Sequence, residues 1–153
     1  MRRKKEGKTD YKARRKMLES ERPRIIIRRT NRYIIVQYVE SEEAKDKIIF
    51  GVNSKKLLDY GWKEEDKGKL KNIQAAYLTG YLFGKMLKDK ELDENAIVDL
   101  GLARTLFKSR IYTSIRGIID SGIKIKAEIE IDEGKIKSEE ITKIKLNIQN
   151  KIK

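Results

Sequence analysis

Three arginines stand around a short predicted turn, at a spacing suited to binding phosphate. The segment Arg22–Tyr38 reads RPRIIIRRTNRYIIVQY, and its two apolar runs flank the pair Thr30-Asn31. Such runs predict two strands joined by a two-residue turn, in which Asn tolerates the positive φ that the turn requires. The turn then carries Arg28, Arg29 and Arg32, whose like charges repel one another in the free protein. A partner with several phosphate groups would neutralise them.

Positive charge is concentrated beside this turn. The chain of 153 residues has 37 Lys and Arg against 24 Asp and Glu, a net charge of +13. Residues 1–32 hold fourteen of the basic and four of the acidic residues. The predicted partner is therefore a polyanion, with nucleic acid as the first candidate and an anionic membrane surface as the second.

Residues 1–22 form a predicted basic arm that binds RNA. Residues 1–8 have almost nothing to bury and are expected to be disordered alone. Thr9 or Asp10 caps a predicted helix that runs to about Glu19. A solubilising tail or a nuclear-type address is the alternative, but the charge continues into the hairpin, which favours phosphate binding. The candidate contacts in the arm are Arg2, Arg3, Lys4, Lys5, Lys8, Tyr11, Arg14 and Arg15.

Composition excludes several classes of site. The sequence has no Cys and no His, which removes disulfides, thiolate metal sites and the commonest general base. No cofactor, metal or small-molecule substrate is predicted. The longest apolar patch, Ala75–Leu87, is interrupted by Lys85 and is too short to span a bilayer. No signal peptide is visible in the first residues, MRRKKEGK, so we expect an intracellular, soluble protein.

The apolar patterns predict an α/β domain over residues 23–125. The order of elements, β-β-β-α-α-β-α, implies a crossover and therefore a mixed sheet. The predicted strands are Arg24–Arg29, Arg32–Val39, Lys47–Val52 and Ala96–Leu102, and the predicted helices are Ser54–Gly61, Leu70–Lys88 and Arg110–Ser121.

Side-chain alternation assigns the two faces of the hairpin. Ile25 and Ile27 share one face of the first strand, and Arg24 and Arg28 share the other. The second face is predicted to meet RNA through these two arginines and an aromatic ring. Asn31 either reads a base edge or a 2′-hydroxyl or serves as the turn residue, and the two roles are equally supported. For Tyr33 and Tyr38, packing in the core is favoured over stacking on bases.

Two helix starts add candidate anion contacts, because backbone amides at a helix N-terminus favour phosphate. Ala76, Gly80 and Gly84 within the first of these helices are predicted to let it approach the sheet closely. The candidate contacts are Lys71 and Asn72 at the start of Leu70–Lys88, and Arg104, Lys108, Ser109 and Arg110 around the start of Arg110–Ser121.

Residues 126–153 form a predicted C-terminal extension with a different composition. Ser138 followed by Ile141, Ile144 and Ile148 indicates a short helix. We expect this helix to become ordered against a partner.

Several segments resemble a ribosomal protein family, the universal large-subunit protein eighteen in its archaeal and eukaryotic form. The resemblance covers residues 9–125, and the family's Pro-Thr and Gly before Ser-Arg are replaced here by Thr105–Lys108. It rests on TDYKARRKMLES at Thr9–Ser20, RPRIIIRRTNRYIIVQ at Arg22–Gln37, LLDYGW at Leu57–Trp62, AAYLTGYLFGK at Ala75–Lys85 and VDLGLARTLFKSRIYTSIRGIIDSGIKI at Val98–Ile125.

The resemblance implies a ribonuclease-H-like α/β fold and a structural role rather than catalysis. The implied partners are 5S rRNA, which the family binds in the central protuberance, large-subunit rRNA and neighbouring large-subunit proteins, and the implied location is the cytoplasmic ribosome. Carried over by position, the implied RNA contacts are Lys8, Tyr11, Arg14, Arg15, Arg24, Arg28, Arg29, Asn31, Arg32, Arg104, Ser109 and Arg110.

A metal-dependent nuclease is the rival reading of such a fold. It requires several carboxylates that converge on Mg²⁺. Asp99 lies on a predicted strand, but the neighbouring strand positions are Ile, Val and Arg. Asp99 is therefore predicted to be a hydrogen-bonded structural residue.

Overall fold

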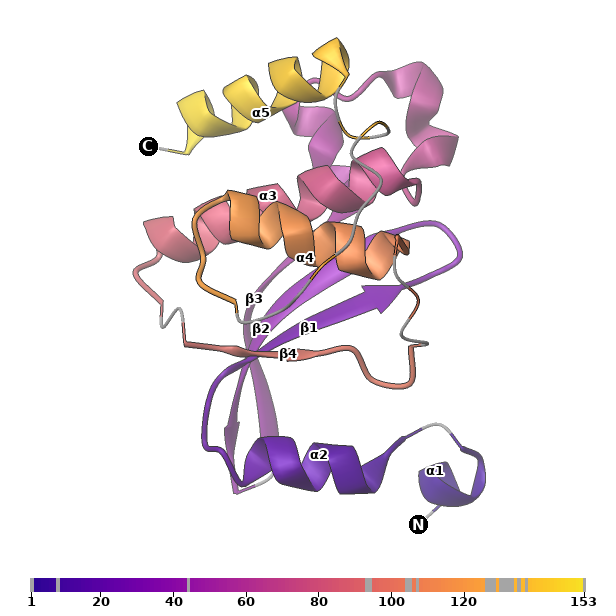
Figure 1. The fold of residues 1–153 in the computed structure, drawn as a ribbon, viewed down its shortest axis with the longest axis vertical. Helices are drawn as coiled ribbons and strands as arrows, with labels where there is room; N and C mark the ends of the chain where they lie inside the picture. Colours follow the sequence, from indigo (N-terminus) through magenta and orange to yellow (C-terminus); the bar gives the residue numbers. More distant parts are fainter. Residues whose placement is uncertain are drawn as a thin grey trace.

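A mixed β-sheet stands at the centre of the computed structural model, which describes residues 2–7, 9–43, 45–92, 95–103, 106, 108–125, 129, 134, 136 and 138–152. Helices α3 and α4 lie between the sheet and α5, and α2 lies on the opposite side of the molecule from α5 (Figure 1). The elements are α1 (Arg2–Lys5), α2 (Tyr11–Leu18), β1 (Arg24–Arg29), β2 (Ile34–Glu42), β3 (Lys45–Asn53), the 3₁₀ helices η1 (Ser54–Tyr60) and η2 (Glu64–Lys69), α3 (Ile73–Asp89), β4 (Ile97–Asp99), α4 (Arg110–Asp120) and α5 (Glu139–Lys151).

The four strands are ordered β3-β2-β1-β4. β2 pairs antiparallel with both β1 and β3, and β4 pairs parallel with β1, which confirms the predicted α/β fold with a mixed sheet. The last strand is shorter than the predicted Ala96–Leu102. It ends at Asp99, and Gly101 has φ of +60°, a left-handed conformation that turns the chain out of the sheet.

The turn between β1 and β2 differs from the prediction. Arg29 pairs with Ile34, so four residues connect the strands rather than two, and Asn31 does not adopt a positive φ. Thr30 closes this wider turn: its amide donates to Tyr33 O over 2.9 Å, and its Oγ1 accepts from Tyr33 N over 2.9 Å. The Thr30 hydroxyl therefore stabilises the turn, whereas an Asn31 with positive φ was predicted to do so.

The core lies between the sheet and α3. Ile25 and Ile27 of β1 are fully buried, as the predicted alternation requires, and they share this layer with Tyr38 of β2. Phe50 of β3 stacks on Tyr38 and on Phe83 of α3, with ring centroids 6.0 and 4.8 Å apart. This layer fixes the orientation of β1 and hence of its arginines on the other face.

Gly80 and Gly84 of α3 meet α4 and not the sheet, which corrects the prediction for these two residues. A Cβ atom on Gly80 would overlap the backbone oxygen of Ser114, and one on Gly84 would overlap the side chain of Ser121. In return, a Cβ on Gly117 of α4 would overlap the backbone oxygen of Tyr77. Glycines on both helices thus allow the two backbones to touch.

The C-terminal helix packs on this chain itself. Ile141, Ile144 and Ile148 of α5 are buried. Gln149 Nε2 donates to the Tyr81 hydroxyl over 2.7 Å and Asn147 Nδ2 donates to Tyr60 O over 3.0 Å. Ser138 caps this helix, which confirms the predicted helix. The helix packs on α3 and η1 of the same chain, whereas it was expected to become ordered against a partner.

Two short helices also differ from the prediction. The predicted helix Ser54–Gly61 is a 3₁₀ helix whose N-cap is Asn53, and Gly61 ends it with φ of +102°. Ser54 Oγ accepts instead from Ile34 N over 3.2 Å. η2 lies between the predicted helices Ser54–Gly61 and Leu70–Lys88, where no helix was predicted.

We expect Gly80→Ala to lower the free energy of unfolding by about 1–3 kcal/mol, because the added methyl group must force α3 and α4 apart. Gly68→Ala is the matched control, since a Cβ there meets no atom within 4 Å. Its effect should stay within about 0.5 kcal/mol. Urea unfolding measures both variants, and equal stability of Gly80→Ala and wild type would contradict the packing described.

Candidate nucleic-acid interface

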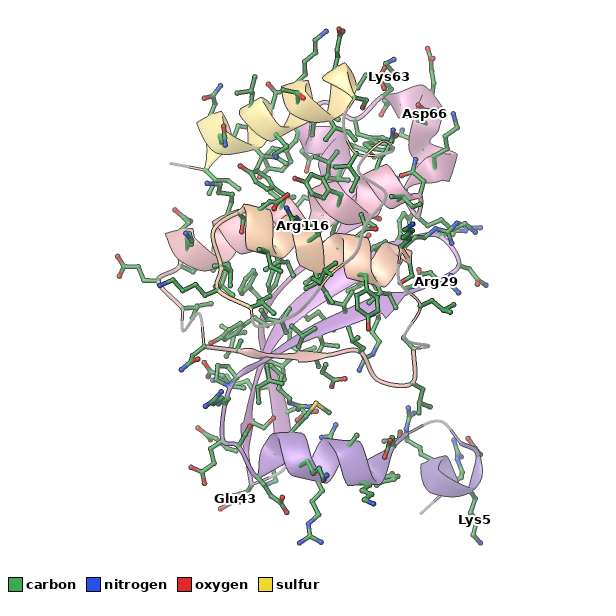
Figure 2. The ribbon with its side chains drawn as sticks, viewed as in Figure 1. Lys5, Arg29, Glu43, Lys63, Asp66 and Arg116 are labelled. Atoms are coloured by element: carbon green, nitrogen blue, oxygen red, sulfur yellow. The ribbon has the colours of Figure 1, made fainter. Side chains whose placement is uncertain are left out.

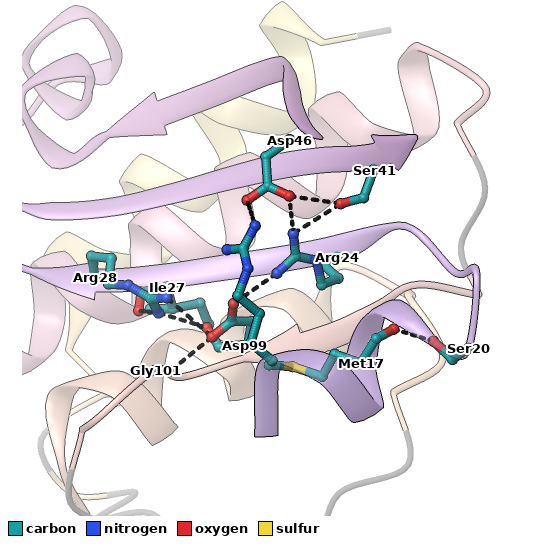
Figure 3. A network of polar contacts seen from close by, with 10 residues as sticks. Met17, Ser20, Arg24, Ile27, Arg28, Ser41, Asp46, Asp99 and Gly101 are labelled. Carbon is teal, nitrogen blue, oxygen red and sulfur yellow. Dashed lines mark hydrogen bonds and ion pairs between the residues drawn. The ribbon is translucent and has the colours of Figure 1, made fainter. Parts of the chain in front are cut away.

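Arg24 is a structural residue at the centre of the sheet. Its side chain is 1% exposed, and its Nη2 donates to Ser41 Oγ over 2.9 Å and to Asp46 Oδ1 over 2.5 Å. Its Nη1 donates to Asp99 Oδ2 over 3.3 Å (Figure 3). This burial argues against the predicted contact between Arg24 and RNA, because the guanidinium is enclosed and is bonded to groups of the same chain.

Asp99 is a hydrogen-bonded structural residue, as predicted. Its Oδ1 accepts from Gly101 N over 2.7 Å, and both carboxylate oxygens face arginines. In the part of the chain that the structure describes, no three acidic side chains gather in a way that could hold a metal ion. Asp46, the other carboxylate on Arg24, is bound by a second arginine instead.

Arg28 lies on the same face of β1 as Arg24 and is partly exposed. Its Nη1 donates to Asp99 O over 2.8 Å and to Ile27 O over 3.0 Å, and its Nη2 donates to Asp99 Oδ1 over 3.0 Å. The side chain remains 41% exposed. Hydrogen bonds from its nitrogens thus hold the guanidinium of Arg28 in place, while part of the side chain faces solvent.

The tip of the hairpin presents charge on an ordered turn. Arg29, Asn31 and Arg32 are exposed, and the bonds of Thr30 fix the backbone between them. Arg29 lines a shallow groove together with Arg110 at the start of α4. The structure therefore brings together two predicted sites that are some 80 residues apart in the sequence (Figure 2).

The arm is attached to the sheet by an ion pair. Asp10 caps α2 by accepting from Lys12 N and Ala13 N over 3.0 Å. Arg14 Nη2 lies 2.8 Å from Asp46 Oδ2, so this predicted RNA contact also holds the arm. Residues predicted to be disordered form the helical turn Arg2–Lys5, in which Arg2, Arg3 and Lys5 are exposed.

Two predicted anion contacts cap their own helices. Asn72 Oδ1 accepts from Ala75 N over 2.7 Å, and Ser109 Oγ accepts from Tyr112 N over 3.5 Å. Lys71 and Lys108 are exposed beside them. Asn72 lines a different groove, next to α5, from the one that Arg29 lines. Lys8, Arg104 and the side chain of Lys4 lie outside the described residues.

Sequence reasoning missed two residues of this region. Asp46 anchors both Arg14 and Arg24, but nothing in the charged run SEEAKDK distinguishes it from its neighbours. Lys55 is exposed beside the hairpin tip, because Asn53 pairs with Ile35 in the sheet. Only the strand register reveals that position.

Asp46 has a lowered pKa. Burial raises the pKa, but the hydrogen bonds from Ser41 and Arg14 and the positive charges of Arg24 and Arg14 outweigh burial. The ionised form is therefore more stable in the folded protein than in the unfolded chain. A depressed pKa contributes stability above the unfolded value of about 3.9, and this contribution is lost as the pH falls through the folded value.

We expect Asp46→Asn to lower the free energy of unfolding at neutral pH by about 1–3 kcal/mol, because charge-assisted hydrogen bonds to two arginines are lost. The difference from wild type should begin to shrink below pH of about 4, where the unfolded chain takes up the proton, and should disappear once the pH has fallen through the lowered pKa of the folded carboxylate. Asp89→Asn, at the exposed end of α3, is the control. Denaturant unfolding between neutral pH and pH 3 measures the effect, and a pH-independent difference would contradict it.

Comparisons with known proteins identify the family. Residues 1–96 match the family described as ribosomal large subunit proteins 60S L5 and 50S L18. The chain is 43% identical over 142 residues to large ribosomal subunit protein uL18 of Korarchaeum cryptofilum, an alignment that covers 92% of this chain and 70% of that protein. The proteins of the same name from Methanoregula boonei and Methanothermobacter thermautotrophicus are 40% and 37% identical, each over 92% of this chain and over 79% and 71% of their own lengths.

The relatives are named as ribosomal proteins, and this family is not enzymatic. That confirms the prediction of a structural role and of a place on the ribosome. The family match covers the arm, the first three strands and α3. The chain belongs to the uL18 family of large-subunit ribosomal proteins.

Proposed function

We propose that this protein binds 5S rRNA and helps to attach it to the large-subunit rRNA in the central protuberance, beside neighbouring large-subunit proteins. The observation that carries the proposal is the ordered arginine turn, in which Arg29 and Arg32 are exposed on either side of a backbone fixed by Thr30. Membership of a large-subunit protein family supports ribosomal RNA as the partner, and the sequence resemblance supports 5S rRNA in particular.

The turn suits a folded RNA. Structured RNA is recognised mainly through its backbone shape and its unpaired bases. Arginines on a rigid turn meet phosphates at fixed positions and lose little conformational freedom on binding. The groove that Arg29 and Arg110 share extends this surface to α4.

A general polyanion or membrane-surface binder is the rival function. A basic arm alone permits it. Among the described helices, none is long and apolar enough to cross a membrane. The rigid turn favours RNA, because attraction to a charged membrane requires no fixed geometry.

Competition between RNAs tests the proposal. Binding to 5S rRNA is measured across a series of NaCl concentrations, with excess tRNA present or absent. We expect binding to 5S rRNA to survive the competitor, since shape and unpaired bases differ between the two RNAs. If tRNA abolishes binding with the same salt dependence, the arginines act as a general polyanion site.

We expect Arg29→Ala and Arg32→Ala each to weaken binding to 5S rRNA by about 1–2 kcal/mol and to reduce the slope of log K against log salt by about one. Each change removes one phosphate contact. Lys88→Ala is the control, because Lys88 is in the last turn of α3, which lies far from the hairpin tip (Figure 1). Wild-type affinity and slope for both tip variants would remove the turn from the interface.

A further inference from the structure

A third groove lies between the arm and the sheet. It has a volume of about 690 Å³ and is lined by Arg3, Tyr11, Arg14 and Met17 from the arm and by Arg28 and Gly101 from the sheet edge. This volume falls within the range of about 300–1,000 Å³ that is usual for sites that enclose small ligands. Arg29 does not line this groove, but the groove adjoins the one that Arg29 and Arg110 share, since Leu102 and Ala103 line both.

Arg28 forms one wall of this groove in a fixed orientation. Asp99 and Ile27 O accept hydrogen bonds from the edges of its guanidinium. A Cβ atom on Gly101 would lie 3.0 Å from Arg28 Cζ, so the guanidinium rests against the glycine backbone. Both N–H groups of Nη1 and one of Nη2 are therefore occupied, and Gly101 covers one face of the guanidinium. Stacking is limited to the opposite face, on a side chain that remains 41% exposed.

A fixed guanidinium plane is a recognised surface for unpaired RNA bases. Tyr11 lines the same groove, and its half-buried ring offers a second such surface. Arg3 and Arg14 add positive charge at the groove, which suits the phosphate attached to the base.

The carboxylates of the groove do not oppose an anion. Asp10 accepts from two backbone amides of α2, and Asp99 is paired with Arg24 and Arg28. Both negative charges are thus compensated by groups of the same chain. Arg14 is paired with Asp46, so the remaining positive charge at the groove comes from Arg3 of the arm.

We propose that this groove receives one unpaired nucleotide of the bound RNA, with its base stacked on Arg28 and Tyr11. This inference rests on the proposed function and adds to it a site that recognises an unpaired base by stacking on its flat face. It gives Arg28 a role different from that of Arg29 and Arg32, which contact phosphate.

Charge-conserving variants test the groove. We expect Arg28→Lys and Tyr11→Leu each to weaken binding to 5S rRNA by about tenfold, since a stacking plane is lost. The salt slope should stay at the wild-type value, because no phosphate contact changes. Tyr11→Phe and Arg29→Lys, which keep the ring or the exposed charge, should bind within about threefold of wild type.

The outcomes separate this site from the proposed function. If wild type keeps selective binding to 5S rRNA while Arg28→Lys and Tyr11→Leu bind equally well, the groove proposal is overturned and the proposed function stands. If Arg28→Lys binds like wild type and Arg28→Ala lowers the salt slope by about one, Arg28 is a phosphate contact. Loss of selectivity in wild type itself overturns both. Tyr11→Leu leaves the Arg28–Asp99 pair intact, so its effect is independent of the ion pairs in the sheet.

Discussion

The buried guanidinium of Arg24 connects the arm, the sheet edge and Arg28, the parts of the structure that we propose to contact RNA. β1 lies in the interior of the sheet, and Arg24 reaches from it to Asp46 on one edge strand and to Asp99 on the other. Asp46 in turn holds the arm through Arg14, and Asp99 holds Arg28. Removal of one partner from a buried ion pair typically costs about 3–5 kcal/mol, because a charge is left without compensation. The arm, the β4 turn and Arg28 therefore depend on one side chain.

The arginines of this family member perform different tasks according to their surroundings. Arg24 is enclosed and stabilises the fold. Arg28 is held by its edges and exposes part of its surface, whereas Arg29 and Arg32 project from an ordered turn. A count of positive charges describes all four alike, but burial and hydrogen bonding determine which of them can meet phosphate. Each class then predicts a different response to salt and to substitution by lysine.

Local sequence signals predicted much of the fold. The apolar alternation of β1 and a cap at Thr9 or Asp10 depend on neighbours within a few residues, and the structure shows both, with Asp10 as the cap of α2. The partners of Arg24 could not be predicted in this way, because Asp46 and Asp99 are 22 and 75 residues away. The contact of Gly80 with α4 likewise depends on tertiary packing. The proposal of 5S rRNA as the partner depends on the family resemblance, since no side-chain pattern in the sequence distinguishes one RNA from another.

Amide hydrogen exchange on the free protein tests most directly whether Arg24 holds the arm and the sheet edge in place. The measurement compares wild type with Arg24→Met at the amides of α2 and β4, with the amides of α3 as the internal reference. We expect protection in α2 and β4 of wild type, and its selective loss in Arg24→Met while α3 stays protected. Unchanged protection of α2 and β4 in Arg24→Met would contradict the central role of this guanidinium, as would an unprotected α2 in wild type.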